Sequence, residues 1–501
     1  MLESLAQAIA NFANPWIWVW IVGGVVWGLA FGLIPGVGSL TAMALFLPFV
    51  FKLDVLEAMP MMVALSAVGF NGGAITAILI GVPGEPPNVA TTFDGYPMTQ
   101  KGEGARAIGA ALTSSLLGGI AAAFLALGMV FAVLPIVMAF TSMEMVFIIL
   151  IGLAFISALG KGSRLKGLIS GGLGLLVSSV GLATVTGEPR YTFGVAFLYD
   201  GFHIVSVSLG LFAVPPMVEL ALKGGSGTIA TGKVVFTEMK DVWRGAKDVF
   251  RHKLLWLRSM IIGYIFGIIP GVGASAAVFV AYGQAKKTSK NPELYGTGIV
   301  EGVIAPESCN NAKESGSWLT TLVLGIPGSG TGAMALGGLI MLGLYPGPTM
   351  LTENMDVSLT LIIILALSNL IGALICFRLA PYLALVSKTP GRVLIPLALV
   401  VIFAGTYAYK GNIEDVAVLL IFSVLGVCMR LFGYNTASLF LGYILGKLFE
   451  DYLFVSLQLS GPLFFLRPIC LALIFFLVVF FLYGPVIYLI KHKIRKGGSR
   501  I

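Results

Sequence analysis

Long runs of apolar residues dominate the chain, and short polar segments separate one run from the next. Such runs include 168–183 and 203–222, and toward the C-terminus 416–431, 437–453 and 469–490. Runs of this length and composition predict helices that cross a lipid bilayer. We therefore predict an all-α polytopic membrane protein with about 10–12 transmembrane segments, some of them broken or re-entrant.

Two pairs of Gly- and Pro-containing segments interrupt these apolar runs. Residues 32–38, GLIPGVG, and 267–273, GIIPGVG, are identical at six of seven positions, at an offset of 235 residues. Residues 81–84, GVPG, and 325–328, GIPG, form a second pair at an offset of 244 residues. A Pro-Gly break frees backbone groups that lipid cannot satisfy, so it persists only where protein or a polar cavity covers it. Corresponding breaks in two halves of a membrane chain are typical of a transporter's binding site.

The composition agrees with a membrane protein that has no large soluble domain. The 501 residues are 57% hydrophobic and 11% charged, whereas soluble domains carry about 25% charged residues. Four scattered cysteines lack metal-ligand spacing and are expected to be packing thiols. Residues 1–15 contain no Lys or Arg, so we expect direct insertion of the first span without a signal peptide.

The one substantial polar interruption is residues 223–258, which hold eight Lys or Arg against three Asp or Glu. Apolar residues recur there at helical spacing while basic residues occupy another face. This pattern predicts a basic amphipathic helix at the membrane surface, with a solvated linker as the alternative. The predicted organisation is an N-terminal segment (1–15), a first membrane repeat (16–222), a cytoplasmic linker (223–258), a second membrane repeat (259–455), an extra C-terminal span (456–490) and a basic cytoplasmic tail (491–501).

The charges of two corresponding loops indicate how the halves are related. The loop at 161–166 carries a net charge of +3, and the loop at 410–415 carries −1. Because Lys and Arg favour the cytoplasmic side, the two loops are predicted on opposite faces, with a periplasmic N-terminus and a cytoplasmic C-terminus. That placement indicates two inverted-topology repeats. The lysines within 286–290 do not fit a full span, so either residues 274–285 are re-entrant or the charge rule fails locally.

Polar and small residues gather at the breaks, where substrate or ions could bind. Amides at a helix start attract anions, freed carbonyls at a helix end coordinate cations, and Asn suits either ligand. For each group a glycine crossing or a simple turn is the alternative. The predicted substrate- or ion-binding residues are Gly36, Gly38, Ser39, Thr41, Asn71, Pro83, Gly84, Asn88, Thr91, Gly271, Gly273, Ser275, Asn310, Asn311, Pro327, Gly328, Ser329 and Thr331.

Three acidic residues near the breaks, Glu85, Asp94 and Glu307, are candidates for coupling transport to a cation. Proton coupling would require one of them to titrate near neutrality through burial. A sodium site needs no acid, because carbonyls, amides and hydroxyls supply oxygen ligands, and the abundance of glycine breaks favours Na⁺. For Asp94, a capping or turn role is an equal alternative.

The sequence lacks the motifs that would indicate an enzyme, a nucleotide-binding protein or a nucleic-acid-binding protein. Only three His occur, without a nucleophile–base pair or metal spacing, so an intramembrane enzyme is disfavoured and no cofactor is expected. No P-loop motif is present, and no basic segment carries interleaved aromatics for nucleic acid. A channel, or a carrier for another small anionic or neutral solute, remains the alternative.

Several motifs together resemble one known family over nearly the whole chain. They are residues 32–38 with Leu47-Pro48, 83–97, 187–194, 267–273 with Tyr282, 301–303, 306–312, 325–329 and 389–392. The chain resembles the large membrane subunit of the tripartite tricarboxylate transporter family. The resemblance implies a cation-coupled importer of di- and tricarboxylates in the bacterial inner membrane. It further implies two partners, a small integral membrane subunit and a periplasmic solute-binding protein. Residues 328–332 are more glycine-rich than the family pattern.

Overall fold

The computed structural model describes residues 2–34, 36–159, 164–222, 239–270, 273–386 and 391–480. It is 83% helical, so the prediction of an all-α polytopic membrane protein is confirmed. The single two-stranded element among the described residues is an antiparallel hairpin of β1 (Gly181–Leu182) and β2 (Pro189–Arg190).

The described residues of the first part of the chain, up to Leu222, fold into ten α-helices and three short 3₁₀ turns. The α-helices are α1 (Leu2–Ala10), α2 (Pro15–Gly32), α3 (Gly38–Val50), α4 (Val55–Ile80), α5 (Val89–Gln100), α6 (Gly104–Val137), α7 (Ser142–Leu159), α8 (Arg164–Ser178), α9 (Ile204–Ser208) and α10 (Val214–Leu222). The 3₁₀ turns are η1 (Asn11–Ala13), η2 (Pro86–Asn88) and η3 (Ala196–Asp200), and a π-helical turn, η4 (Leu209–Ala213), joins α9 to α10.

The second part has a similar series of helices. They are α11 (Met239–Arg251), α12 (Lys253–Ile268), α13 (Gly273–Thr288), α14 (Glu301–Leu324), α15 (Gly330–Met341), α16 (Pro348–Thr352), α17 (Met355–Val386), α18 (Gly391–Lys410), α19 (Ile413–Leu431) and α20 (Thr436–Ser460), with 3₁₀ turns η5 (Pro292–Leu294) and η6 (Gly461–Leu466). A last described helix, Pro468–Phe480, is bent by 63° from the segment before it. Because α20 continues to Ser460, the predicted boundary at 455/456 falls inside a helix.

Six described helices are long and apolar enough to cross a membrane, or up to seven if the bent pair is one span. Four shorter apolar helices, including α3 and α15, add to these. Two of these, α3 and α15, begin directly after a Gly- and Pro-containing break, since such residues interrupt a helix before it reaches spanning length.

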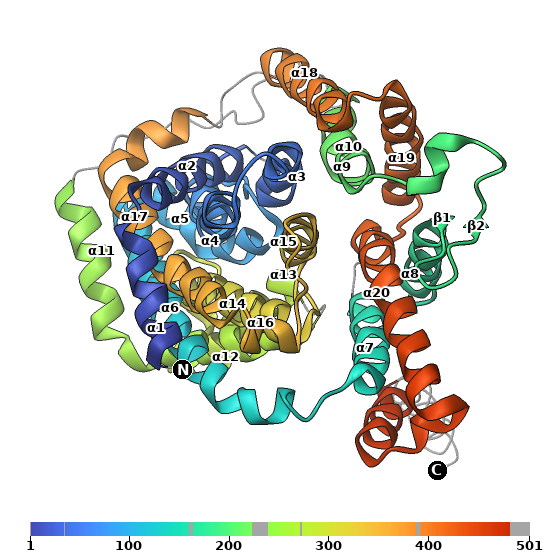
Figure 1. Cartoon of the computed structure of the whole chain (residues 1–501). Helices are drawn as coiled ribbons and strands as arrows, with labels where there is room; N and C mark the ends of the chain where they lie inside the picture. The colour runs from blue at the N-terminus through green and yellow to red at the C-terminus, as the bar shows by residue number, and fades with distance from the viewer. Residues whose placement is uncertain are drawn as a thin grey trace, which may run out of the picture.

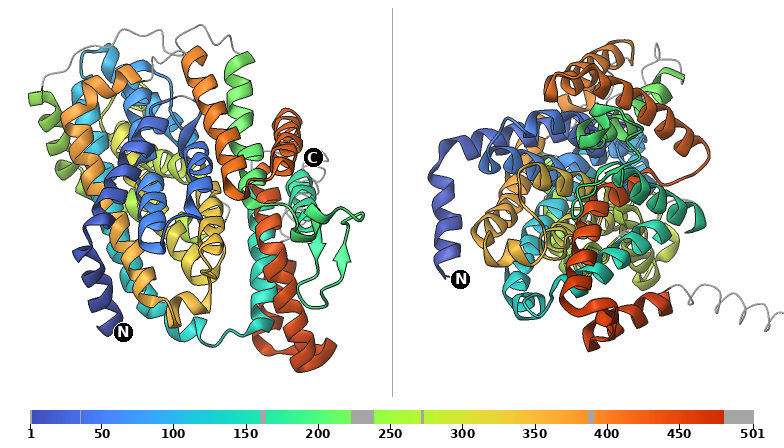
Figure 2. Two further views of the ribbon diagram at one scale, coloured as in Figure 1. Left: turned by 45° about the horizontal axis from the view of Figure 1, so that its top comes forward. Right: turned by 45° about the vertical axis from the view of Figure 1, so that its right-hand side comes forward.

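The helices form two groups, which Figure 1 shows side by side and Figure 2 shows from two further directions. The inner bundle consists of α1–α6 and α11–α17, and the outer layer consists of α7–α10 and α18–α20. The two groups meet where α3 contacts η4 and α18, and where α15 contacts α20. Each predicted repeat therefore contributes helices to both groups.

The inner bundle contains the same helix pair twice. A Cβ added to Gly32 of α2 would lie 2.0 Å from the Gly69 carbonyl oxygen of α4, and one added to Gly267 of α12 would lie 2.2 Å from the Lys313 carbonyl oxygen of α14. These contacts match at offsets of 235 and 244 residues, the offsets of the two sequence pairs. Glycine is required at both positions because the helix backbones touch there.

The helices that follow the two glycine breaks turn back beside the helices before them. In the first half, the Trp27 indole donates to the Ala42 carbonyl at 3.1 Å. In the second half, Gln284 donates to Ser259 at 3.3 Å and Arg258 donates to Thr288 at 3.1 Å. The C-terminal end of α13 thus lies beside the first turns of α12, as the re-entrant alternative for residues 274–285 requires.

The corresponding helices α4 and α14 cross in opposite chain directions. The Trp318 indole donates to the Ser66 hydroxyl at 2.8 Å, and the Asn311 amide donates to the Asn71 carbonyl oxygen at 3.0 Å. Residue numbers therefore rise along one helix as they fall along the other.

The predicted amphipathic helix is present as α11, and it lies against α6. A Cβ on Gly245 would lie 1.8 Å from the Arg106 carbonyl oxygen, and one on Gly109 would lie 1.9 Å from that of Val242. Arg106 also donates to Asp248 at 2.6 Å. The apolar face of α11 is thus divided: one strip packs on protein, while Trp243 stays exposed.

Candidate functional site

Each Pro-Gly tip folds back onto the glycine break of its own half. A Cβ on Gly84 would lie 2.0 Å from the Gly32 carbonyl oxygen, and one on Gly328 would lie 2.8 Å from that of Gly267. The second tip also reaches the first break, because Gly330 lies against Leu40. The structure therefore brings both breaks and both tips into one contiguous region of the inner bundle.

At the first tip the Glu85 carboxylate faces the N-terminus of α3. The Ser39 backbone N–H donates to Glu85 Oε1 at 2.9 Å, and the Ser39 hydroxyl donates to the same oxygen. Gly38 and Gly69 border this carboxylate closely. Amides and the dipole at a helix start stabilise a negative charge, so α3 offers Glu85 a favourable position.

A second buried carboxylate, Glu307 of α14, gathers donors from three other elements. The Thr91 hydroxyl of α5 donates to Oε1, and the Ser115 hydroxyl of α6 donates to Oε2 at 3.0 Å. The Asn88 amide of η2 lies 3.4 Å from Oε1 and also donates to the Phe70 carbonyl at 3.1 Å. We call these four residues the Glu307 cluster. None of the described Lys, Arg or His side chains forms an ion pair with Glu307.

A ladder of buried amides lies beside the Glu307 cluster. The Asn311 NH₂ group donates to Asn71 Oδ1 at 3.0 Å and to Asn369 Oδ1 at 2.6 Å. The Oδ1 atoms of Asn310 and Asn311 are buried without a hydrogen-bond partner among the described residues. An unpaired buried carbonyl oxygen is costly, so these atoms are available to a cation or another ligand.

At the second tip hydroxyls take the place of the carboxylate. Ser329 caps α15 by accepting from the Gly332 backbone N–H at 3.1 Å. Its hydroxyl lies 2.9 Å from the Thr331 hydroxyl and 3.4 Å from that of Ser317. Pro327 precedes this cluster and packs against Gly332.

The Asp94 carboxylate accepts hydrogen bonds from backbone N–H groups rather than facing the other candidate residues. It accepts from the backbone N–H groups of Gly296, Gly298 and Ile299 at 2.8–3.1 Å and from the Tyr282 hydroxyl at 2.8 Å. This geometry is that of the capping alternative, because it fixes the segment before α14 to α5. A coupling role for Asp94 stays a prediction.

The remaining predicted residues lie at the edges of this region. Thr41 donates to the Phe212 carbonyl of η4 at 3.1 Å and so links α3 to the outer layer. Gly36 has φ +84° with open space around it, and Ser275 is half-buried in the first turn of α13. Pro83 stands in the first tip, Gly273 begins α13, and Gly271 lies outside the described residues.

Sequence reasoning missed a buried ion pair within α14. Lys313 donates to Glu314 at 2.8 Å, and the two side chains are 0% and 2% exposed. A Lys-Glu dipeptide within a predicted membrane segment was the available signal, because intramembrane charges are rare and mark functional sites.

Two other polar contributors, Ser115 and Asn369, were also missed. The buried His203–Asp415 pair, whose Nδ1 and Oδ1 atoms lie 2.5 Å apart, was missed as well, but it joins α9 to α19 in the outer layer. A lone Ser, Asn or His in an apolar run carries no pattern that predicts its partner.

An apolar cavity of about 410 Å³ lies between the second glycine break of the inner bundle and helix α7 of the outer layer. Pro270 and Ile326 line it from the inner bundle, and Ile148 of α7 and Leu473 line it from the other side. Its walls give no polar group for a carboxylate substrate.

These features define a polytopic membrane protein with a polar core built at paired helix breaks. Its sequence matches the description "Tripartite tricarboxylate transporter TctA family" over residues 18–441, and the chain belongs to this family, a family of transporters. The resemblance predicted from the motifs is thereby confirmed.

Two relatives from Agrobacterium vitis are similar to the chain. An uncharacterized 52.8 kDa protein in the TAR-I ttuC' 3' region is 30% identical over 477 residues, which cover 95% of this chain and 94% of that protein. An uncharacterized protein in the TAR-II ttuC' 3' region is 32% identical over 215 residues, which cover 42% of this chain and 89% of that protein. No solved structure matches the chain.

Proposed function

We propose that this membrane component of a tricarboxylate transport system imports di- or tricarboxylates together with Na⁺. It resides in the bacterial inner membrane, with the N-terminus in the periplasm. It works with a small integral membrane subunit and receives its substrate from a periplasmic solute-binding protein. Family membership supports the transport role, and the geometry of the polar core supports the coupling.

The Glu307 cluster is the observation that carries the proposal. A fully buried carboxylate needs a counter-charge or a proton, and Glu307 has neither Lys, Arg nor His beside it among the described residues. Two hydroxyl oxygens already lie against its carboxylate, and rotation of the Asn88 amide would add Oδ1, which is otherwise unpartnered. Carboxylate, hydroxyl and amide oxygens are the ligands that hard cations prefer. These four residues would hold the transported Na⁺.

The energetics of carboxylate import require a coupling ion. Moving each negative charge into a negative-inside cell costs about 2.3 kcal/mol per 100 mV. The sequence contains no P-loop motif that would supply this work from a nucleotide. Co-transported cations that neutralise or reverse the charge moved provide it instead.

Proteoliposomes that contain the carrier, its small subunit and its binding protein test the coupling. An inward Na⁺ gradient at fixed pH, with a protonophore present, should drive citrate uptake. Glu307→Gln should raise the Na⁺ concentration for half-maximal uptake at least tenfold, whereas Glu293→Gln, at an exposed acid, should leave it unchanged. Full uptake driven by a pH gradient without Na⁺ would refute sodium coupling and favour Glu307 as a proton carrier.

We also propose that the two halves are inverted repeats that alternate access to the polar core. The opposite directions of α4 and α14, and the matched contacts of α2–α4 and α12–α14, support this relation. Cysteines introduced at Ser163 and Asn412 should react with impermeant reagents from opposite membrane faces. Ser163 lies outside the described residues, so the labelling tests the orientation independently of the structure. Labelling of both from one side would exclude the inverted arrangement.

The binding-protein partnership is tested with the same vesicles. Uptake should fall to background when the solute-binding protein is omitted. Uptake of equal rate without it would favour the alternative, an autonomous channel or carrier for another small solute.

A further inference from the structure

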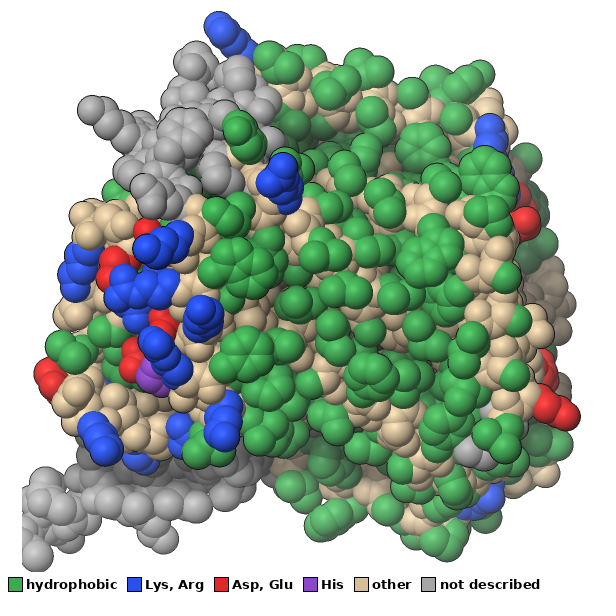
Figure 3. Space-filling view, turned by 90° about the vertical axis from the view of Figure 1, so that its left-hand side faces the viewer, with side chains coloured by type: hydrophobic (Ala, Val, Ile, Leu, Met, Phe, Trp, Pro, Cys, Tyr) green, Lys and Arg blue, Asp and Glu red, His purple; other side chains and the backbone are tan. Residues whose placement is uncertain are grey.

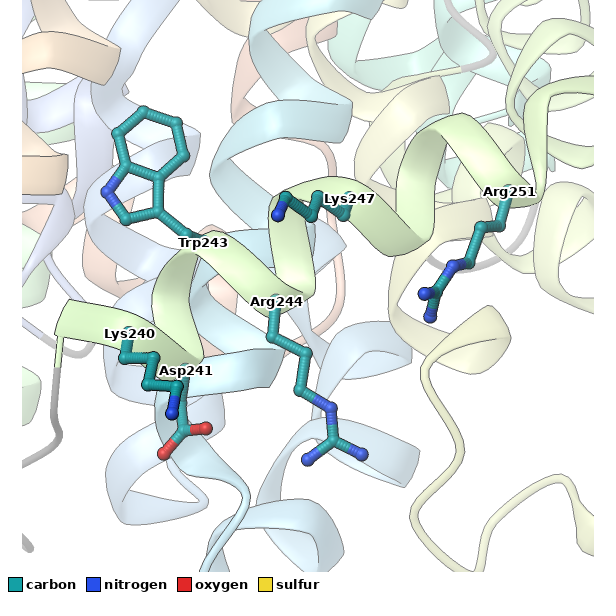
Figure 4. A pocket seen from close by; sticks show the side chains of 6 residues that line it. All are labelled: Lys240, Asp241, Trp243, Arg244, Lys247 and Arg251. Atoms are coloured by element: carbon teal, nitrogen blue, oxygen red, sulfur yellow. The ribbon is translucent and has the colours of Figure 1, made fainter.

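A basic groove on α11 has no role in the proposed transport site. It is a cavity of about 540 Å³ lined by Lys240, Asp241, Trp243, Arg244, Lys247 and Arg251 (Figure 4). In the close-up, Lys240, Asp241 and Arg244 extend from one side of the helix, and the Trp243 indole extends from the other. Four basic residues and one acid therefore line a hollow large enough for a phosphoglycerol group.

Three of the four basic side chains of this groove, Lys240, Arg244 and Lys247, are not used for holding the fold together. Asp248, which fixes α11 to α6, pairs with Arg106 at 2.6 Å and with Arg251 at 3.1 Å. Lys240, Arg244 and Lys247 are exposed and pair with no acid of the described residues. Unpaired like charges on consecutive turns repel one another, so an anion bound among them is stabilised.

The groove lies at the border of the lipid-facing surface. Figure 3 shows the side of the molecule that carries α11, with Lys and Arg side chains gathered along one edge of a broad hydrophobic face. The Trp243 indole stacks on Phe377 of α17, with ring centroids 6.1 Å apart and planes 8° apart. Leu374, one turn earlier on α17, is 61% exposed. An aromatic anchor between apolar helix and basic groove is typical of the headgroup depth of a bilayer.

We propose that this groove binds the headgroup of an anionic phospholipid, with Lys240, Arg244 and Lys247 contacting its phosphate and Trp243 marking the level of its glycerol. Charge complementarity selects an anionic over a zwitterionic headgroup, and the adjoining apolar face receives the acyl chains. Because α11 lies between the two halves of the chain and packs on α6, a bound lipid would fix this surface of the inner bundle. The inference does not depend on which solute or cation is transported.

Binding of fluorescent phosphatidylglycerol to the detergent-solubilised full chain tests the proposal. The triple variant Lys240→Gln/Arg244→Gln/Lys247→Gln should bind about 100-fold more weakly, from about a fivefold loss per basic side chain. The matched control Lys286→Gln/Lys287→Gln/Lys290→Gln removes the same charge from exposed positions of the neighbouring helix hairpin and should bind as the wild type does. Arg244→Lys keeps the charge and should retain binding. Retained binding would show that α11 stays folded when this side chain is replaced.

Two comparisons identify the ligand. Phosphatidylcholine should compete at least tenfold more weakly than phosphatidylglycerol, and free glycerol phosphate should compete only at much higher concentration. Equal weakening by both triple variants would show non-specific attraction and overturn the proposal. Competition by free glycerol phosphate as strong as that by the lipid would overturn it in favour of a soluble anion.

Discussion

Removing one partner of the buried Lys313–Glu314 pair should destabilise the protein strongly. Lys313→Met keeps nearly the same side-chain volume, so it removes the charge without opening a cavity. Glu314 would then remain 2% exposed, with Oε1 deprived of its donor and Oε2 already unpartnered among the described residues. Breaking a buried pair in this way costs about 3–5 kcal/mol.

The converse variant, Glu314→Gln, leaves the Lys313 ammonium buried without its acidic partner, so it should destabilise the protein to a similar degree.

Reversible unfolding of the detergent-solubilised chain at pH 7 measures these free energies. Lys290→Met and Glu293→Gln, at exposed positions, are the matched controls and should change stability by less than about 0.5 kcal/mol. The double variant Lys313→Met/Glu314→Gln should recover most of the stability, since a neutral pair leaves no buried charge. Single variants as stable as the wild type would refute the reasoning and show that water reaches the pair.

Three further variants address the packing of the inner bundle. Gly84→Ala should abolish carboxylate uptake with normal membrane abundance, because its Cβ would meet a backbone oxygen of α2 at 2.0 Å; Gly128→Ala, in open space, should transport normally. Asp248→Asn should detach α11 from Arg106 and increase amide hydrogen exchange across residues 239–251 by at least tenfold, while exchange in α14 stays unchanged. Ser329→Ala removes the N-cap of α15 and should lower the free energy of unfolding by about 1 kcal/mol in chemical denaturation, whereas Ser329→Asp should retain it.

The sequence alone determined the class of this protein and the places where its helices break. Apolar runs and a charged fraction of 11% require a lipid environment, irrespective of how the helices pack. The two repeated Gly-Pro pairs marked the breaks correctly, since proline and positive-φ glycine act through local backbone geometry. The same local motifs identified the family.

Only the tertiary structure decided which side chains meet. Glu307 and Thr91 are 216 residues apart, and the amides of Asn71 and Asn311 are 240 apart. No periodicity predicts such pairs, because helices that are apolar on every side give no pattern for the face that packs against protein. Likewise, the charge rule left residues 274–285 open, and the contacts of α13 with α12 decided their course. The backbone preference of each residue is local and can be read from the sequence. A buried polar core instead depends on hydrogen bonds between residues that are far apart in the chain and meet only when the helices pack.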